Sequence, residues 1–196
     1  MSSKNLDAIL TDVVNAAKAH RIKAAKIIIN EKTLIKELVY FVFKTENKLS
    51  IKAAWILEWI CSHNNIDYII PHLTYFCDNL HTLKFDSSKR PCAKVCELLA
   101  ISYTEKQPNL IQQKLSADNI EKIIETGFDW LITEQKIAVK AYTMTTLYLF
   151  GKNSNWIHSE LYTIIQKDVI HQSKGCEARG KKIMKLINKT NSILPN

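Results

Sequence analysis

A short pattern, Ile-Lys-Ala-Ala, occurs at residues 22–25 and again at 51–54, and the related Val-Lys-Ala occurs at 139–141. The first two copies are 29 residues apart, and the third follows 88 residues after the second, about three times that interval. Each copy lies near the start of a stretch whose apolar residues have helical spacing. Self-similarity at a period of roughly 20–50 residues is typical of stacked repeat units. We therefore expect an array of repeats.

Composition favours helices over strands. Hydrophobic residues make up 46% of the 196 residues, which is ample for a buried core. Only four Gly and four Pro are present, and neither Asn-Gly nor Asp-Gly occurs, so the turn residues of an all-β protein are missing. We expect a single helical-repeat domain covering residues 1–196.

Helical spacing predicts ten segments, at 5–18, 20–29, 32–44, 50–63, 68–83, 88–103, 117–132, 134–150, 154–167 and 175–190. Residues 104–116 are expected to be a longer connection. Consecutive segments pair into units of repeat length, at 20–44, 50–83, 88–132 and 134–167. Because each pair can bury its second face only against the next, the expected fold is an all-α, right-handed α-solenoid of four to five helical pairs. Five residues are expected to be largely buried between the helices: Trp55, Ile56, Leu131, Ala141 and Leu147.

Serine residues precede four of these segments and are expected to cap them: Ser50, Ser87 or Ser88, Ser116 and Ser154. Pro91 would then lie in a first helical turn, where its missing N–H costs nothing. Gly151 follows the segment that ends at Phe150, where a left-handed C′ residue would fall.

The unit length, the two-helix organisation and the small residues at the pattern positions resemble HEAT-type and armadillo-type repeats. The chain also resembles a group of short bacterial helical-repeat proteins that are sometimes labelled adenylosuccinate lyase. This second resemblance is carried by Trp-Ile-Leu-Glu-Trp at 55–59, Ser-Ser-Lys-Arg-Pro at 87–91 and Phe-Asp-Trp-Leu-Ile at 128–132.

The lyase label implies a mobile loop that reads Ser-Ser-x-Met-Pro-x-Lys-x-Asn-Pro. Residues 87–94 match its Ser-Ser-x-x-Pro but lack the Met and the Asn-Pro, and their Lys is one position late. The chain is also less than half the length usual for that family. A serine-capped helix with Pro in its first turn explains every matching residue, so lyase activity is not expected.

No residue pattern indicates an enzyme. The chain lacks a P-loop, Gly-x-Ser-x-Gly and Gly-x-Gly-x-x-Gly, so no cofactor is expected. The five cysteines are Cys61, Cys77, Cys92, Cys96 and Cys176. They show no Cys-x-x-Cys spacing and are odd in number, which favours reduced core thiols over a metal site or disulfides.

The formal net charge is +8, and the sequence pI is about 9.2. Cations recur at similar positions in the first helix of each unit, and stacking would place them in a row. In the pattern copies the Lys is expected to snorkel from a mostly buried face. The candidate binding surface therefore comprises Lys52, Lys89, Arg90, Lys94, Lys140 and Arg179.

Two functions remain open. The first is a non-enzymatic module that binds a protein partner on its solenoid surface. The alternative is a nucleic-acid-binding solenoid related to the HEAT-like alkylpurine DNA glycosylases, because Trp55 and Trp59 lie near Lys52 and aromatic residues can stack on bases. Neither a secretory signal nor a membrane-spanning run is evident, so the chain is expected to be cytoplasmic and away from membranes.

Overall fold

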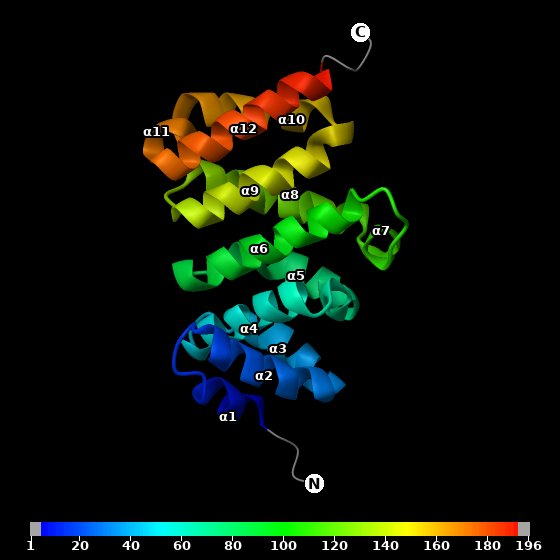
Figure 1. The fold of residues 1–196 in the computed structure, drawn as a ribbon, viewed down its shortest axis with the longest axis vertical. Helices are drawn as coiled ribbons and strands as arrows, with labels where there is room; N and C mark the ends of the chain where they lie inside the picture. The colour runs from blue at the N-terminus through cyan, green and yellow to red at the C-terminus, as the bar shows by residue number, and fades with distance from the viewer. Residues whose placement is uncertain (1–4, 192–196) are drawn as a thin grey trace.

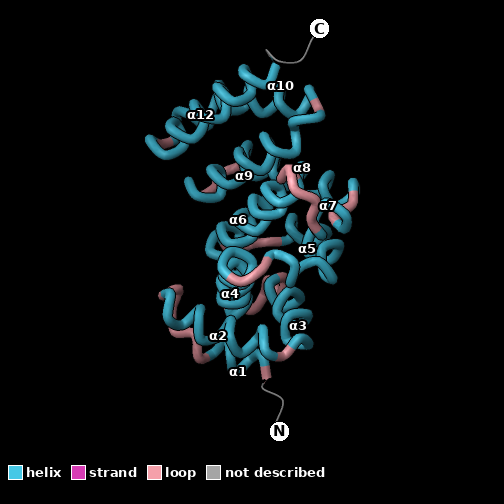
Figure 2. The backbone as a smooth tube through the Cα atoms, turned by 45° about the vertical axis from the view of Figure 1, so that its right-hand side comes forward, coloured by secondary structure: helices cyan, strands magenta, loops and turns pink. Residues whose placement is uncertain are grey.

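The computed structural model describes residues 5–191, apart from the side chains of Lys32 and Asn191, and this part of the chain is helical with no strand. The helices follow one another along the long axis of the molecule, from α1 at one end to α12 at the other (Figure 1). They lie in two layers, which are seen side by side in Figure 2. The expected all-α class is therefore confirmed for the described residues.

The first layer contains five helices, each packed on the next: α2 (Lys18–Asn30), α4 (Leu49–His63), α6 (Asp86–Tyr103), α9 (Ile137–Phe150) and α12 (Lys174–Asn191). The second layer contains α3 (Lys32–Val42), α5 (Leu73–Asn79), α8 (Ala117–Ile132) and α10 (Asn155–Ile164). Two second-layer helices pack closely on the first helix of the following pair, α3 on α4 and α8 on α9, whereas α5 packs on α8. The first-layer helices thus form a continuous stack, with second-layer helices packed behind it.

Short elements complete the chain. They are α1 (Leu6–Thr11), α7 (Leu110–Lys114) and α11 (Ile170–Gln172), together with 3₁₀ segments at Ile66–His72, Leu80–Thr82 and Gly151–Asn153 and a π segment at Ile165–Val169. None of the described helices is both long and apolar enough to cross a bilayer.

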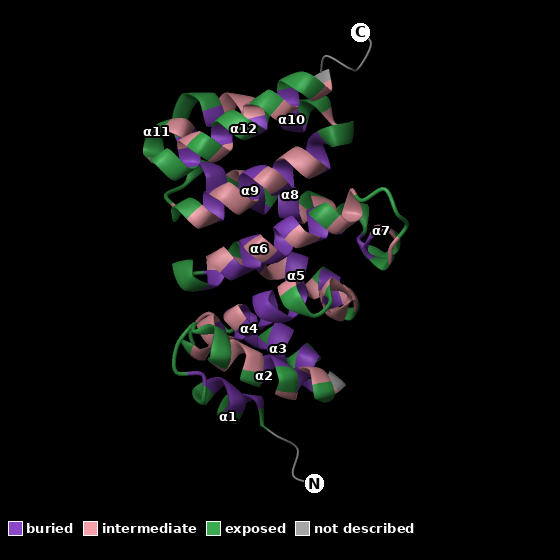
Figure 3. Cartoon of the chain, in the orientation of Figure 1, coloured by how far each residue is buried: buried purple, intermediate pink, exposed green. Residues whose placement is uncertain are grey.

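The core is one continuous apolar cluster that runs the length of the stack between the layers. Figure 3 shows buried positions on the inner sides of the helices and exposed ones on their outer sides. Ile56, Leu131 and Leu147 are fully buried, as predicted, whereas Trp55 and Ala141 are half-buried on the outer side of the first layer. All five cysteines are buried and free, as the prediction of core thiols requires.

Four predicted elements differ from the structure. The segment expected at 5–18 ends at Thr11, and residues 12–17 form a loop. The connection 104–116 contains α7, which is held by a capping box between Asn109 and Gln112. The segment expected at 68–83 begins as a 3₁₀ segment that contains Pro71, because proline removes a backbone donor. The segment expected at 154–167 continues through the π segment to Gln172.

The predicted serine caps are correct in part. Ser116 accepts a hydrogen bond from the Asn119 backbone N–H, as expected. Ser154 occupies the N-cap position of α10, but its side chain makes no capping bond. Ser50 is buried inside α4, whose first turn is instead bonded by the Asn47 side chain.

The start of α6 also differs from the prediction. The helix begins at Asp86, so Pro91 lies in its second turn and Ser88 is buried within it. Because proline has no N–H to donate, the carbonyl oxygen of Ser87 loses its normal helical partner. The indole N–H of Trp55, on α4, donates to that oxygen over 3.2 Å. Pro91 thereby creates the acceptor that ties α4 to α6.

Gly151 is not left-handed, contrary to the prediction. Its φ is −74°, and none of the described glycines has a positive φ. A Cβ at this position would lie 2.5 Å from the ring of His158, which itself bonds the Tyr148 carbonyl oxygen over 2.9 Å. Glycine is therefore required at this position because the ring of His158 lies so close, and not because of the backbone conformation.

Candidate functional site

The predicted candidate surface lies in the first layer, where charged side chains from successive helices meet. Glu58, on α4, lies between two arginines from the neighbouring helices. Its Oε2 is 3.0 Å from Nη2 of Arg90, on α6, and 3.7 Å from Nη1 of Arg21, on α2. One carboxylate therefore joins three helices.

A second carboxylate repeats this arrangement further along the stack. Oε2 of Glu97, on α6, is 2.6 Å from Nζ of Lys94, and its Oε1 is 3.8 Å from Nη1 of Arg179, on α12. Arg179 also donates to Oγ1 of Thr145, on α9, over 2.8 Å. Since Arg90 and Lys94 are one turn apart on α6, the two clusters are continuous.

We call this set the ion-pair band, and its members are Arg21, Glu58, Arg90, Lys94, Glu97 and Arg179. The carboxylates lie underneath, with side chains only 10% and 5% exposed, whereas the four cations are between 19% and 39% exposed. Ion pairs held in this way fix the directions of the cations. The band thus presents mainly positive groups to solvent, although it contains two acids.

Aromatic rings lie beside the cations of the band. The guanidinium of Arg21 is 4.8 Å from the ring centre of Trp59, and Nζ of Lys94 is 5.1 Å from that of Tyr142. The ring of His63 also stacks on the ring of Trp59, with ring centres 3.7 Å apart. Cation–π contacts of this kind restrict the directions of the cations further.

The six predicted residues divide into two groups. The band contains Arg90, Lys94 and Arg179, and Lys89 is half-buried next to Arg90 in the chain. Lys52 instead donates to the Thr11 carbonyl oxygen over 3.2 Å, which ties α4 to the end of α1. Sequence reasoning missed the two acids and Arg21, although Arg21 directly precedes the first copy of the repeated pattern.

Lys140 does not reach the surface, contrary to the expected snorkelling. Its residue is 2% exposed, and Nζ donates to the Leu131 carbonyl oxygen over 2.9 Å. Leu131 lies in the last turn of α8, where carbonyl oxygens lack helical partners and a positive charge is favourable. Lys140 thus acts as a C-terminal cap for α8, at the base of a cleft that is also lined by Asp168 and Gln172.

The thiols offer no reactive site. Burial raises the pKa of Cys61 to about 12, with Glu58 adding to the shift, and burial likewise raises the pKa of Cys77 to about 12. Thiols with such pKa values stay protonated at neutral pH and are poor nucleophiles and poor metal ligands. Among residues 5–191, no group of three or more His, Cys, Asp or Glu side chains is arranged to hold a metal ion.

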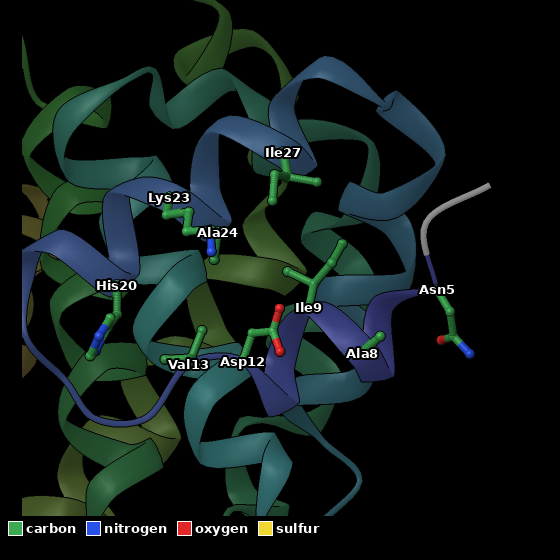
Figure 4. Close-up of a pocket in the computed structure, with 9 residues that line it drawn as sticks. All are labelled: Asn5, Ala8, Ile9, Asp12, Val13, His20, Lys23, Ala24 and Ile27. Atoms are coloured by element: carbon green, nitrogen blue, oxygen red, sulfur yellow. The ribbon is translucent and has the colours of Figure 1, made fainter. Parts of the chain in front are cut away.

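A separate cavity of about 460 Å³ lies at the N-terminal end of the stack, between α1 and α2 (Figure 4). Its walls are mostly apolar and include Ile9, Val13 and Ile27, with Asp12 and Lys23 among its polar residues. None of the six predicted cations lines it.

Comparisons with known proteins give this chain no relative: no family model, curated protein or solved structure matches it.

Proposed function

We propose that the chain is a right-handed α-solenoid of HEAT-like helical pairs and that it acts as a non-enzymatic module binding an acidic segment of a protein partner along the ion-pair band. The fold part of the proposal is supported by the stacking of each pair on the next in two layers. The repeated spacing of the Ile/Val-Lys-Ala pattern supports it too. Surfaces of this kind bind extended partners in many repeat proteins.

One observation carries the binding proposal: two buried carboxylates hold four partly exposed cations in a continuous row from α2 to α12. An arginine has five N–H donors, and an ion pair with one carboxylate oxygen leaves most of them free. These remaining donors can bind carboxylates of a partner, while the half-buried Tyr142 supplies apolar contact.

A protein partner is favoured over nucleic acid because the cations already share their charge with Glu58 and Glu97. Nucleic-acid surfaces gain affinity mainly from uncompensated Lys and Arg that displace counterions from many phosphates. Two acids within the row reduce that gain, whereas they suit a partner that alternates acidic and apolar residues. We further propose a cytoplasmic location, which the five free cysteines support.

The test is fluorescence anisotropy at about 150 mM salt, a condition at which exposed charges are screened beyond about 8 Å. The probes are a labelled peptide of alternating Glu and Phe, a Lys/Phe peptide of equal length, duplex DNA and single-stranded RNA. We expect the Glu/Phe peptide to bind best. The double variant Arg90→Ala/Arg179→Ala should weaken it by about tenfold or more, since truncating central arginines commonly costs over 1 kcal/mol.

The matched control is Lys181→Ala/Lys185→Ala, which removes the same charge from exposed positions of α12 outside the band. Equal losses in both double variants would show a general charge effect and overturn the proposal. Preferential binding of DNA or RNA that is lost in Arg90→Ala/Arg179→Ala would replace the protein partner with nucleic acid.

A further inference from the structure

An apolar groove that contains no residue of the ion-pair band lies between second-layer helices, at the ends of α6 and α9. The helices α8 and α10 both pack on α9 but make little contact with each other, and a hollow of about 420 Å³ lies between them. Its apolar lining includes Tyr103, Ile120, Phe150 and Ile157. Figure 2 shows the two helices as neighbours in the same layer.

Trp156 lines one wall of this groove and is unusually exposed for a tryptophan. It is 61% exposed, and its ring centre lies 5.8 Å from that of Phe128, on α8. Aromatic residues contribute little while exposed to water but dominate binding energies once a partner covers them.

The rim of the groove is acidic. Glu121 and Glu125 lie one turn apart on α8, and both are exposed and line the groove. No described cation lies within ion-pair distance of either carboxylate. Two unpaired acids at the edge of an aromatic groove are notable in a chain whose net charge is +8.

We infer that this groove docks a basic amphipathic helix of a protein partner. A groove between two helices accepts a third helix whose apolar residues recur at i, i+3, i+4 and i+7. Its apolar face covers Trp156, and its Lys or Arg side chains pair with Glu121 and Glu125. The partner chemistry is thus opposite in charge to that of the ion-pair band, so the two surfaces take different segments.

The inference is tested with three labelled 18-residue peptides: an amphipathic Leu/Lys helix, its Leu/Glu counterpart, and a Leu/Lys peptide of the same composition in scrambled order. We expect only the amphipathic Leu/Lys peptide to bind the full chain. Trp156→Ala, and separately Glu121→Lys/Glu125→Lys, should weaken its binding by about tenfold.

Two matched controls should leave this binding unchanged. Ile132→Ala removes an apolar residue that is 63% exposed on α8 but does not line the groove, and Glu37→Lys reverses an exposed charge on α3. The double variant Arg90→Ala/Arg179→Ala should also leave it unchanged, which separates this inference from the proposed function.

Three results would overturn the inference. One is equal binding of the scrambled peptide, and another is unchanged affinity in Trp156→Ala. The third is self-association by sedimentation that Trp156→Ala abolishes, because the occupant of the groove would then be a second copy of this chain.

Discussion

The helices of the two layers differ in length and continuity. The first-layer helices α4, α6 and α9 run for 15, 18 and 14 residues, and each is flanked by first-layer neighbours and backed by the second layer. In the second layer, α5 and α10 have only 7 and 10 residues and continue as 3₁₀ or π segments. The first-layer helices are long enough to hold charges one turn apart on the same face, and the ion-pair band lies along them.

Exposed side chains follow the same division. Outward positions of the first layer carry cations such as Arg90 and Arg179, which pair across helices or turns with the buried Glu58 and Glu97. Outward positions of the second layer include the exposed aromatic Trp156 and the unpaired acids Glu121 and Glu125. The difference is the basis of the two modes of recognition that we propose: fixed donors on the first layer and an apolar groove on the second.

The largest expected effect separates the inner and outer sides of α8. Leu131 is completely buried against the first layer, while its neighbour Ile132 is exposed. Leu131→Ala should lower the free energy of unfolding by about 2–5 kcal/mol, because a cavity remains in the core. Urea denaturation followed by circular dichroism measures this. A loss below about 0.5 kcal/mol, no larger than that for Ile132→Ala, would mean that α8 does not join the layers as described.

The next effect concerns the buried acids of the first layer. Glu97→Gln keeps the shape of the side chain but removes the charge that pairs with Lys94 and Arg179. We expect a loss of about 1–3 kcal/mol in unfolding free energy, discounted because both cations are partly exposed. Glu177→Gln, which removes an exposed acid paired with Lys181, is the control and should change the denaturation midpoint little. Equal effects of the two variants would contradict a special role for the buried carboxylate.

A smaller effect is expected where the layers meet at α12. A Cβ on Gly180 would lie 2.8 Å from methyl groups of both Ile165 and Ile170. Overpacking lowers the free energy of unfolding by about 1–3 kcal/mol, and the better helix propensity of Ala raises it by about 1 kcal/mol. Gly180→Ala should therefore destabilise by about 1 kcal/mol in thermal denaturation. Gly127→Ala, whose Cβ would come no closer than 3.2 Å to a side chain, should be near neutral, and the reverse order would refute this packing.

The smallest effect is a pH dependence that arises from the buried thiols. The pKa of Cys61 is raised from 9.0 to about 12 in the folded chain, so the unfolded chain loses this proton first as the pH rises. The contribution of this thiol to the unfolding free energy is fully present below pH 9 and is lost as the pH rises from 9 towards 12. Cys61→Ala should therefore make the decline in unfolding free energy between pH 9 and 10 shallower, by under about 1 kcal/mol per pH unit. An unchanged slope would place Cys61 in contact with solvent.

Local signals predicted most of the helices. Apolar periodicity gave α4, α8 and α9 to within a few residues, and Ser116 caps α8 as predicted. Errors occurred where a tertiary contact overrode the local signal. Ser88 is buried because α6 begins earlier, at Asp86, and Pro91 is accepted in the second turn because Trp55 bonds the freed Ser87 carbonyl oxygen.

The candidate site was less predictable than the fold. A row of cations followed from the repeated Lys and Arg positions, and three of the six predicted residues lie in the band. Lys140 occupies the same pattern position as Lys52 yet is buried as a cap for α8. The pattern could not distinguish them, because a lysine's role depends on which helix end lies beside it.

The sequence by itself determined that the described chain is helical and that the alanines of the first two pattern copies, at 24–25 and 53–54, are buried, because both follow from spacing along a single helix. Tertiary structure alone decided that Glu58 and Glu97 lie beneath the cations and that Trp156 remains open beside Glu121. Arg21 and Glu58, or Glu97 and Arg179, are brought within ion-pair distance only when separate helices stack. Pairing between charges far apart in the chain depends on that packing, and no local pattern in the sequence encodes it.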